Sequence, residues 1–411
     1  MVAANRFPWS TNRGEVELIV RPFTGRLVAP DWAARVVAPM SDGLSAAERT
    51  RLAASRDSFL SVTRPVPGEL DVDESGEWLV NNRAALGGLL DRNAYSSLSG
   101  PRLLVYRMHV ADRQHTGLIV EVAASAFADH QVRGHESVHA DRVDKLVRQY
   151  DAVPVQAELV ALLHDHDDYV EGLIEAVLAS TPILAFQDVS GVGQEVWAIS
   201  DPAIVAAAVA HLSSLGLYIA DGHHRVAAAV RRWESGGCDP VETVLAIAYP
   251  AHQLHLLAFH RYLHGPVDAA ELLAAMRGVG HLEPVGVASS VVPELGPGKV
   301  GCYVAGQWWT LTWPDPHQLG AAGLDVTLLH RNVLEPFVGW ELGARLETTP
   351  ELLGVQQLVE RADDEAGAVF ALAPPTIVEL MEVADRGEVM LPKSTFFDPK
   401  PRGGLVLLGA V

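Results

Sequence analysis

One short stretch near the middle of the chain limits the possible folds more than any other part of the sequence. The apolar run LGLYIA at 215–220 is typical of a buried strand, and the polar turn DGHHR at 221–225 follows it directly. The run VAAAVRRWES at 226–235 is typical of a helix, and VETVLAIAYP at 241–250 indicates a second buried strand. A strand, a tight turn, a helix and a strand in this order form an α/β unit. We therefore predict a mixed α/β (α+β) fold.

The length of the chain predicts more than one domain. It has 411 residues, and at about 150 residues per domain this corresponds to two or three. We place soft boundaries that give an N-terminal α/β region at 1–125, a core with the DGHHR turn at 126–265, and a C-terminal α/β region at 266–411. Hydrophobic residues make up 49% and charged residues 20%, which excludes a long disordered protein.

Three further segments predict individual elements. Ser45 stands three residues before Glu48, which is the spacing of a capping box and favours a helix over 45–60. The run at 102–124 contains two apolar stretches around a polar turn near 112–115, which predicts a hairpin. After residue 134 a loop leads into a helix, because apolar residues recur there at spacings of three and four.

The charge balance restricts the partners. Acidic residues outnumber Lys and Arg by 51 to 31, so the formal net charge is −20. Such a surface repels phosphate backbones, and we expect no nucleic-acid partner, although one concentrated anion pocket remains compatible with it. Two cysteines, Cys238 and Cys302, are too few for a disulfide framework. We see no secretory signal and no apolar run of roughly 18 residues, so we expect a cytoplasmic protein without a membrane span.

The DGHHR turn is the first candidate site. A helix N-terminus exposes unpaired N–H groups that favour phosphate, Gly222 allows close backbone approach, and Arg225 could clamp phosphate oxygens. His223 and His224 could donate to phosphate or carry protons, and Asp221 could orient a hydroxyl or help to hold Mg²⁺. The alternative is structural: Asp221 is a plain helix cap and the histidines are exposed residues at the helix start.

The second candidate is the segment with His135 and Glu136, which Arg142 follows on the predicted helix. A glutamate beside a histidine could act as a general base. The alternative is that an acid in a first helical turn only stabilises the helix dipole.

The third candidate is the loop with Lys393, Ser394 and Thr395. The chain has only four lysines, and two of them, Lys393 and Lys400, fall in this loop. A lysine followed by hydroxyls suits phosphate binding, but the Walker pattern GxxxxGK[ST] is absent from the sequence. The alternative is a solvated basic loop near the C-terminus.

A further tract, HDHDD at 164–168, contains imidazoles and carboxylates that could ligate a divalent ion. Polar residues are also expected at such a boundary between elements, so the tract is equally compatible with an ordinary turn.

Together these segments resemble a known family. The motifs are VRPF at 20–23, TGLIVEV at 116–122, LYIADGHHRVAAA at 217–229, LEPFVG at 334–339 and GEVMLPKSTFFDPKPRGGL at 387–405. In this order they resemble the DUF1015 family, whose activity is largely unassigned. That family is in turn similar to the ParB/sulfiredoxin superfamily, which implies a small α/β core with a phosphate-binding turn. It is also similar to the free serine kinases.

The resemblance implies roles for individual residues. Glu136 matches the glutamate that activates the substrate hydroxyl, and Asp221 matches an acid that binds substrate or takes part in catalysis. The implied phosphate-binding residues are Gly222, His223, His224, Arg225, Lys393, Ser394 and Thr395. His135 and Arg142 are implied as supporting residues.

The same resemblance implies ligands and partners. ATP or ADP is the expected phosphoryl donor, with Mg²⁺, and free L-serine or a related hydroxy amino acid is the expected acceptor. A homodimer is compatible with it. Departures from the family pattern at 38–43 and 137–140 leave the acceptor open. The alternative is a nucleotide-binding regulatory module of ParB-like type, which needs the phosphate turn but no base.

Overall fold

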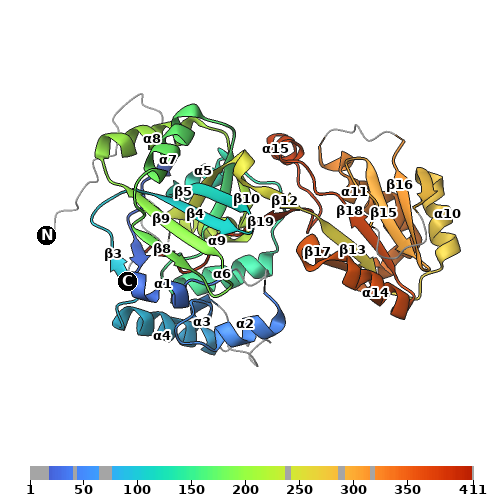
Figure 1. Ribbon diagram of the computed structural model, residues 1–411, viewed down its shortest axis with the longest axis horizontal. Coiled ribbons are helices and arrows are strands. Elements are labelled where there is room, and N and C mark those ends of the chain that lie inside the picture. The colour runs from blue at the N-terminus through green and yellow to red at the C-terminus, as the bar shows by residue number, and fades with distance from the viewer. Residues whose placement is uncertain are drawn as a thin grey trace.

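The computed structural model describes residues 18–39, 44–63, 76–236, 242–285, 292–314 and 320–409. The described chain forms two lobes, a larger one around a nine-stranded sheet and a smaller one around a six-stranded sheet (Figure 1). The mixed α/β fold is thereby confirmed. In the described part of the chain, no helix is both long and apolar enough to cross a membrane.

The larger sheet mixes parallel and antiparallel strands in the order β6-β10-β7-β11-β5-β4-β9-β8, with β1 beside β5. Its strands are β1 (Val20–Arg21), β4 (Leu103–Val110), β5 (Arg113–Ala123), β6 (Val132–Arg133), β7 (Val160–His164), β8 (Leu184–Gln187), β9 (Gly193–Ile199), β10 (Leu217–Asp221) and β11 (Thr243–Pro250). The sheet therefore takes strands from both sides of residue 125. The division at residues 125 and 265 stays a prediction.

Helices cover both faces of this sheet, because both of its faces are apolar. Neighbouring side chains of β4 alternate between two cores: Leu103 and Val105 belong to one, and Leu104 and Tyr106 belong to the other. The helices of this lobe are α1 (Pro30–Val36), α2 (Ala46–Ala53), α3 (Leu60–Thr63), α4 (Glu77–Asp91), α5 (Ala124–Ala128), α6 (Ala140–Ala152), α7 (Asp168–Leu178), α8 (Pro202–Ser214) and α9 (His223–Glu234). Of these, α1, α3 and α4 contribute to the core that contains Leu104, and α5, α8 and α9 contribute to the core that contains Leu103, on the opposite face.

Two predicted elements differ from the structure. The capping box of Ser45 and Glu48 is confirmed, but helix α2 ends at Ala53 and the chain turns before α3, where Asp57 pairs with Arg35 and Arg92. The hairpin of β4 and β5 is also confirmed. Its turn is shorter than predicted, because β5 already begins at Arg113. The predicted helix after residue 134 is confirmed as α6.

The smaller lobe is antiparallel. Its strands follow the order β14-β16-β15-β18-β13-β17. They are β13 (Phe259–Leu263), β14 (His281–Pro284), β15 (Lys299–Val304), β16 (Gln307–Thr312), β17 (Leu346–Pro350) and β18 (Ala368–Leu372). The helices of this part are α10 (Ala269–Val279), α11 (Asp325–Leu329), α12 (Glu335–Val338), α13 (Leu342–Arg345), α14 (Val355–Glu365) and α15 (Ile377–Asp385).

The last segment of the chain runs back from the smaller lobe to the larger one (Figure 1). Strand β19 (Phe396–Asp398) pairs with β12 (His255–Leu257) between the lobes. Strand β20 (Val406–Leu407) then joins β2 (Arg26–Val28), which also pairs with β3 (Tyr95–Ser97). This return places the loop around Lys393 next to the larger sheet, where the candidate site lies.

Candidate functional site

The DGHHR turn joins the end of β10 to the start of α9. Gly222 has a φ of 109°, a conformation that side chains disfavour. A Cβ atom at this position would lie 2.9 Å from the Arg225 Nη2 atom. Glycine is therefore needed here both for the backbone angle and for the close approach of the Arg225 side chain.

Asp221 binds two cations instead of capping the helix. Its Oδ2 accepts from Arg225 Nη2 at 2.5 Å, and its Oδ1 accepts from Lys400 Nζ at 2.6 Å. The residue at the cap position is Gly222, so the alternative of a plain Asp221 cap is wrong. Burial alone would raise the pKa of Asp221, but the charges of Lys400 and Arg225 outweigh it and hold this pKa well below its usual range. Asp221 is thus a stable anion with both oxygens occupied.

Glu136 lies beside this turn. Its Oε2 atom is 3.6 Å from His223 Nδ1, and its main chain forms a bridge with Met390 of the returning segment. Helix α6 begins only at Ala140, so Glu136 is not an acid of a first helical turn and that alternative is wrong. Burial raises the pKa of Glu136, against the lowering effect of the Lys393 charge. A half-exposed carboxylate with a raised pKa is suited to accept a proton.

His135 and His223 form a buried pair of neutral rings. The main-chain N–H of His135 donates to the ring Nε2 of His223 at 3.2 Å, and the two ring centroids are 4.6 Å apart. Burial lowers the pKa of His135 to about 4. Burial, followed by the nearby His135, lowers the pKa of His223 well below its ordinary value. Since Nε2 of neutral His223 accepts a hydrogen bond, its Nδ1 carries the proton, and this N–H faces Glu136.

His224 sits at the outer edge of the site. Its ring Nε2 accepts from the main-chain N–H of His139 at 3.1 Å, and the two rings stack with centroids 5.8 Å apart. Burial and then the charge of Arg142 lower the pKa of His224. The alternative of two exposed histidines at the helix start is therefore wrong for His223, which is buried, and His224 is only half-exposed.

The Lys393 loop reaches the same place from the end of the chain. Thr395 Oγ1 lies 3.2 Å from His135 Nε2, and the Ser394 hydroxyl donates to the Leu391 carbonyl at 2.6 Å. Lys393 itself is exposed and has a φ of 59°. The structure thus brings the three predicted segments together, although they are spread over more than 250 residues of the chain.

The family model described as "Protein of unknown function (DUF1015)" matches residues 20–328. The chain belongs to the DUF1015 family. A comparison with curated proteins gives no match.

Several solved structures resemble this DUF1015 member at low identity. A free serine kinase mutant in complex with ADP has 12% identity and a TM-score of 0.39, and the match covers 71% of this chain and 91% of that chain. A free serine kinase in complex with AMP has 13% identity and a TM-score of 0.38, with the same coverage. SbnI with a C-terminal truncation from Staphylococcus aureus has 12% identity and a TM-score of 0.37, covering 69% of this chain and 85% of that chain.

Cations outnumber carboxylates at the site of this DUF1015 protein. Glu136 and Asp221 are surrounded by four basic side chains whose charges lower the pKa of one or the other. These are Arg142, Arg225, Lys393 and Lys400. The whole chain carries a formal net charge of −20, so this local excess of positive charge differs from the chain as a whole and is chemically suited to an anion.

Sequence reasoning missed two residues of the site. Lys400 was noted only as a lysine of the same loop, and its rarity in this chain was the signal that could have identified it as the partner of Asp221. Arg261 donates to the Lys393 carbonyl at 3.0 Å, and no local motif marks it.

The HDHDD tract lies elsewhere and behaves as a polar turn. Asp167 caps helix α7 by accepting from the Val170 N–H, and His166 pairs with Asp168 and Glu171. Across the residues that the structure describes, no group of three or more His, Cys, Asp or Glu side chains is arranged to hold a metal ion.

Proposed function

We propose that this protein is a nucleotide-dependent phosphotransferase that phosphorylates the hydroxyl of a small molecule, with free L-serine or a related hydroxy amino acid as acceptor. The observation that carries this proposal is the position of Glu136. Its carboxylate lies 3.6 Å from His223, at the edge of a cation-rich turn, and burial raises its pKa. A phosphate-binding module needs the cations, but only a transfer enzyme needs such a base.

The turn supplies the charge that a transferred phosphoryl group requires. The first N–H groups of α9 lie at the positive end of the helix dipole. Lys393 is exposed, and it is close enough for its charge to lower the pKa of His224 in that first turn. In phosphoryl transfer, catalysis comes mainly from positioning and from stabilising charge on the moving group. Lys393 is the cation best placed to contact nucleotide phosphates, because Arg225 is already committed to Asp221 and to the Leu159 carbonyl.

Glu136 accepts the proton of the acceptor hydroxyl. As this oxygen attacks the terminal phosphorus, the bond from phosphorus to the bridging oxygen breaks and the shortened nucleotide leaves. Glu136 holds the proton until it is released to solvent. The Nδ1–H group of His223 faces the carboxylate and helps to orient it.

Asp221 acts by holding cations rather than by moving protons. Both of its oxygens are engaged, and its pKa lies well below the usual range. It keeps Arg225 and Lys400 in place beneath the turn. The same pairing means that Asp221 does not fit as a direct ligand of Mg²⁺, so we derive no step through a protein-held ion. Mg²⁺ is ordinarily carried on nucleotide phosphates with few protein ligands.

We also propose that the chain belongs to the ParB/sulfiredoxin superfamily. The core at 126–265, which contains the DGHHR turn, and the division of the chain into three regions are also part of the proposal. The acidic surface favours a small-molecule partner over nucleic acid.

A transfer assay tests the proposal. Purified protein is incubated with Mg²⁺ and either ADP or ATP, together with free serine and a panel of small hydroxyl compounds, and products are identified by mass spectrometry. We expect phosphoserine or a related phosphoester with the wild type and at least about 100-fold slower formation of it with Glu136→Gln. Asp141→Asn, which changes an exposed acid in the first turn of α6, is the matched control and should retain activity.

Two other results would change this proposal. Nucleotide binding without any phosphorylated acceptor would replace the transferase by a regulatory nucleotide-binding module. Transfer at a rate near that of the wild type in Glu136→Gln would show that another group is the base.

A further inference from the structure

A strand of the smaller lobe supports the Lys393 loop. Phe259 and Arg261 are two residues apart on β13, so both side chains lie on one face of that strand. Both contact the loop. The Phe259 ring lies 5.3 Å from Lys393 Nζ, and Arg261 donates to the Lys393 carbonyl at 3.0 Å. The loop is therefore held from the smaller lobe while it faces the turn of the larger lobe.

Arg261 is a buried cation whose acceptors are carbonyl groups. It is 3% exposed. Besides the Lys393 carbonyl, it donates to the Phe259 carbonyl at 3.1 Å and lies 3.5 Å from the Pro392 carbonyl. Burial lowers its pKa to about 10, so it stays protonated at neutral pH. Burying a guanidinium is costly unless its donors are used, and here they are used to fix the main chain of the loop.

The loop needs this support because of its conformation. Lys393 has a φ of 59°, in the left-handed region that residues with a Cβ atom rarely adopt. Such a conformation persists only where the surroundings enforce it. The Arg261 guanidinium binds the carbonyl of this very residue, and the Phe259 ring faces its ammonium group, so the main chain and the side chain of Lys393 are each fixed by one residue of β13.

We propose that Arg261 and Phe259 are positioning residues that hold Lys393 over the phosphate turn, so that the smaller lobe is a required part of the nucleotide site. This inference rests on the proposed function, because it assigns Lys393 to nucleotide phosphates. It goes further in naming what places that lysine. The two lobes then act as one site: the larger lobe supplies the turn and the base, and the smaller lobe presents the lysine.

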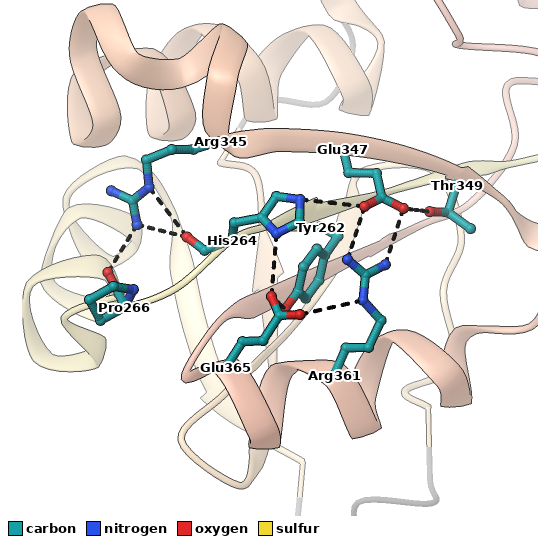
Figure 2. A network of polar contacts seen from close by, with 8 residues as sticks. All are labelled: Tyr262, His264, Pro266, Arg345, Glu347, Thr349, Arg361 and Glu365. Carbon is teal, nitrogen blue, oxygen red and sulfur yellow. Dashed lines mark hydrogen bonds and ion pairs between the residues drawn. The ribbon is translucent and has the colours of Figure 1, made fainter. Parts of the chain in front are cut away.

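Nucleotide affinity provides the first test. Binding of ADP is measured by calorimetry on the full chain for the wild type, Arg261→Met and Arg345→Met. Arg345 is a matched control, because it also donates to two carbonyls, those of His264 and Pro266, at 2.8 Å and 2.9 Å in the same lobe (Figure 2). We expect Arg261→Met to weaken ADP binding about tenfold, as loss of one charged contact to phosphate does, and Arg345→Met to change it less than about twofold.

A double-mutant cycle shows whether Arg261 acts through Lys393. In a Lys393→Met background, Arg261→Met should have less than about a twofold further effect on ADP affinity, because the residue that it positions is gone. Effects that simply multiply would overturn the proposal. Phe259→Leu keeps an apolar side chain at this place and removes only the ring, so it should weaken binding by a smaller factor without unfolding the lobe.

Hydrogen exchange tests the positioning without any nucleotide. The peptide that covers residues 391–397 should exchange faster in Arg261→Met than in the wild type, and Arg345→Met should leave it unchanged. Unchanged exchange in Arg261→Met would overturn the proposal. If the wild type binds neither ADP nor ATP, the proposed function fails, and the same exchange data then decide separately whether Arg261 holds the loop.

Discussion

Two clusters of charged and aromatic residues in this protein use the same side-chain types in opposite ways. The cluster around Asp221 in the larger lobe has more cations than carboxylates, and the side chains of Asp221, Arg225 and Lys400 at its centre are at most 19% exposed. The cluster in the smaller lobe, drawn in Figure 2, joins Arg361 to Glu347 at 3.0 and 3.2 Å and places His264 between Glu347 and Glu365. Each of these four residues has a partner of opposite or complementary character, and their side chains are more than a third exposed.

The glutamates of the two clusters show the difference most directly. Burial raises the pKa of Glu136. The hydrogen bond from Arg361 lowers the pKa of Glu347, and the hydrogen bond from the Tyr262 hydroxyl lowers that of Glu365. A carboxylate stabilised as an anion is a poor proton acceptor, whereas one with a raised pKa is a better one. Ion pairs alone therefore do not point to a functional site, whereas a carboxylate with a raised pKa beside an excess of cations is the pattern expected of one.

The largest expected effect is on transfer. Replacing Glu136 with Gln should lower kcat by about 10²–10⁴, the range that a positioned general base contributes, and should leave the nucleotide Kd within about threefold. Glu347→Gln in the smaller lobe should leave kcat unchanged. Steady-state kinetics with the acceptor identified by the transfer assay measure both. An equal loss of kcat in the two variants would remove the functional distinction between the clusters.

The next effect is a dependence of stability on pH that arises from the buried histidine pair. Burial lowers the pKa of His135 to about 4 in the folded protein, whereas a histidine in the unfolded chain has the ordinary value of 6.5. The unfolded state thus binds more protons between these values, so unfolding free energy should rise by about 3 kcal/mol as pH rises from 4 to 6.5. Asp221 titrates below this window, because its folded pKa is depressed.

His135→Gln isolates this contribution. The rise in unfolding free energy between pH 4.5 and 7, measured by urea denaturation, should become flatter in this variant. The other buried histidines whose pKa values burial lowers, His115, His164, His223 and His260, still contribute to the rise. A rise as steep as that of the wild type would mean that His135 is protonated in the folded protein.

A third and smaller effect concerns the pairing of Asp221. Lys400→Met leaves one oxygen of a largely buried carboxylate without its ion pair, since the side chains of Lys400 and Asp221 are only 13% and 19% exposed. We expect a loss of about 2 kcal/mol of unfolding free energy at pH 7, somewhat below the loss from a fully buried pair. Urea denaturation measures it, and a loss under about 0.5 kcal/mol would show that solvent or Arg225 replaces the lysine.

The local parts of the site could be predicted from the sequence and the long-range parts could not. The strand, turn and helix around Gly222 are contiguous, so their residue types and order were enough. The contact between Lys400 and Asp221 joins residues 179 positions apart, and it depends on how the last segment returns from the smaller lobe. Arg261 carries no motif at all, because its partners are carbonyl groups, which every residue possesses.

The same reasoning explains the errors in the predicted elements. The capping box correctly predicted where helix α2 begins, because its two residues lie within one turn. The predicted end of the helix was wrong: the chain leaves the helix at Ala54, and Asp57 then pairs with Arg35 and Arg92, which lie far from it in the sequence. Local hydrogen bonds were therefore predictable and tertiary ion pairs were not.

The smallest expected effect lies in the Figure 2 cluster. Arg361→Met removes a bidentate contact to Glu347 and the contact of the guanidinium with the Tyr262 ring, whose centroid lies 4.4 Å away. The side chains of Arg361 and Glu347 are, however, 37% and 39% exposed. Exposed pairs contribute little, so we expect a loss of about 1 kcal/mol of unfolding free energy that shrinks further in 1 M salt. Transfer activity should remain at the wild-type level. If Arg361→Met instead lowered transfer as strongly as Arg261→Met lowers nucleotide binding, the cluster would be coupled to the Lys393 loop through the neighbouring residues of β13, and the contrast between a functional and a purely structural cluster would no longer hold.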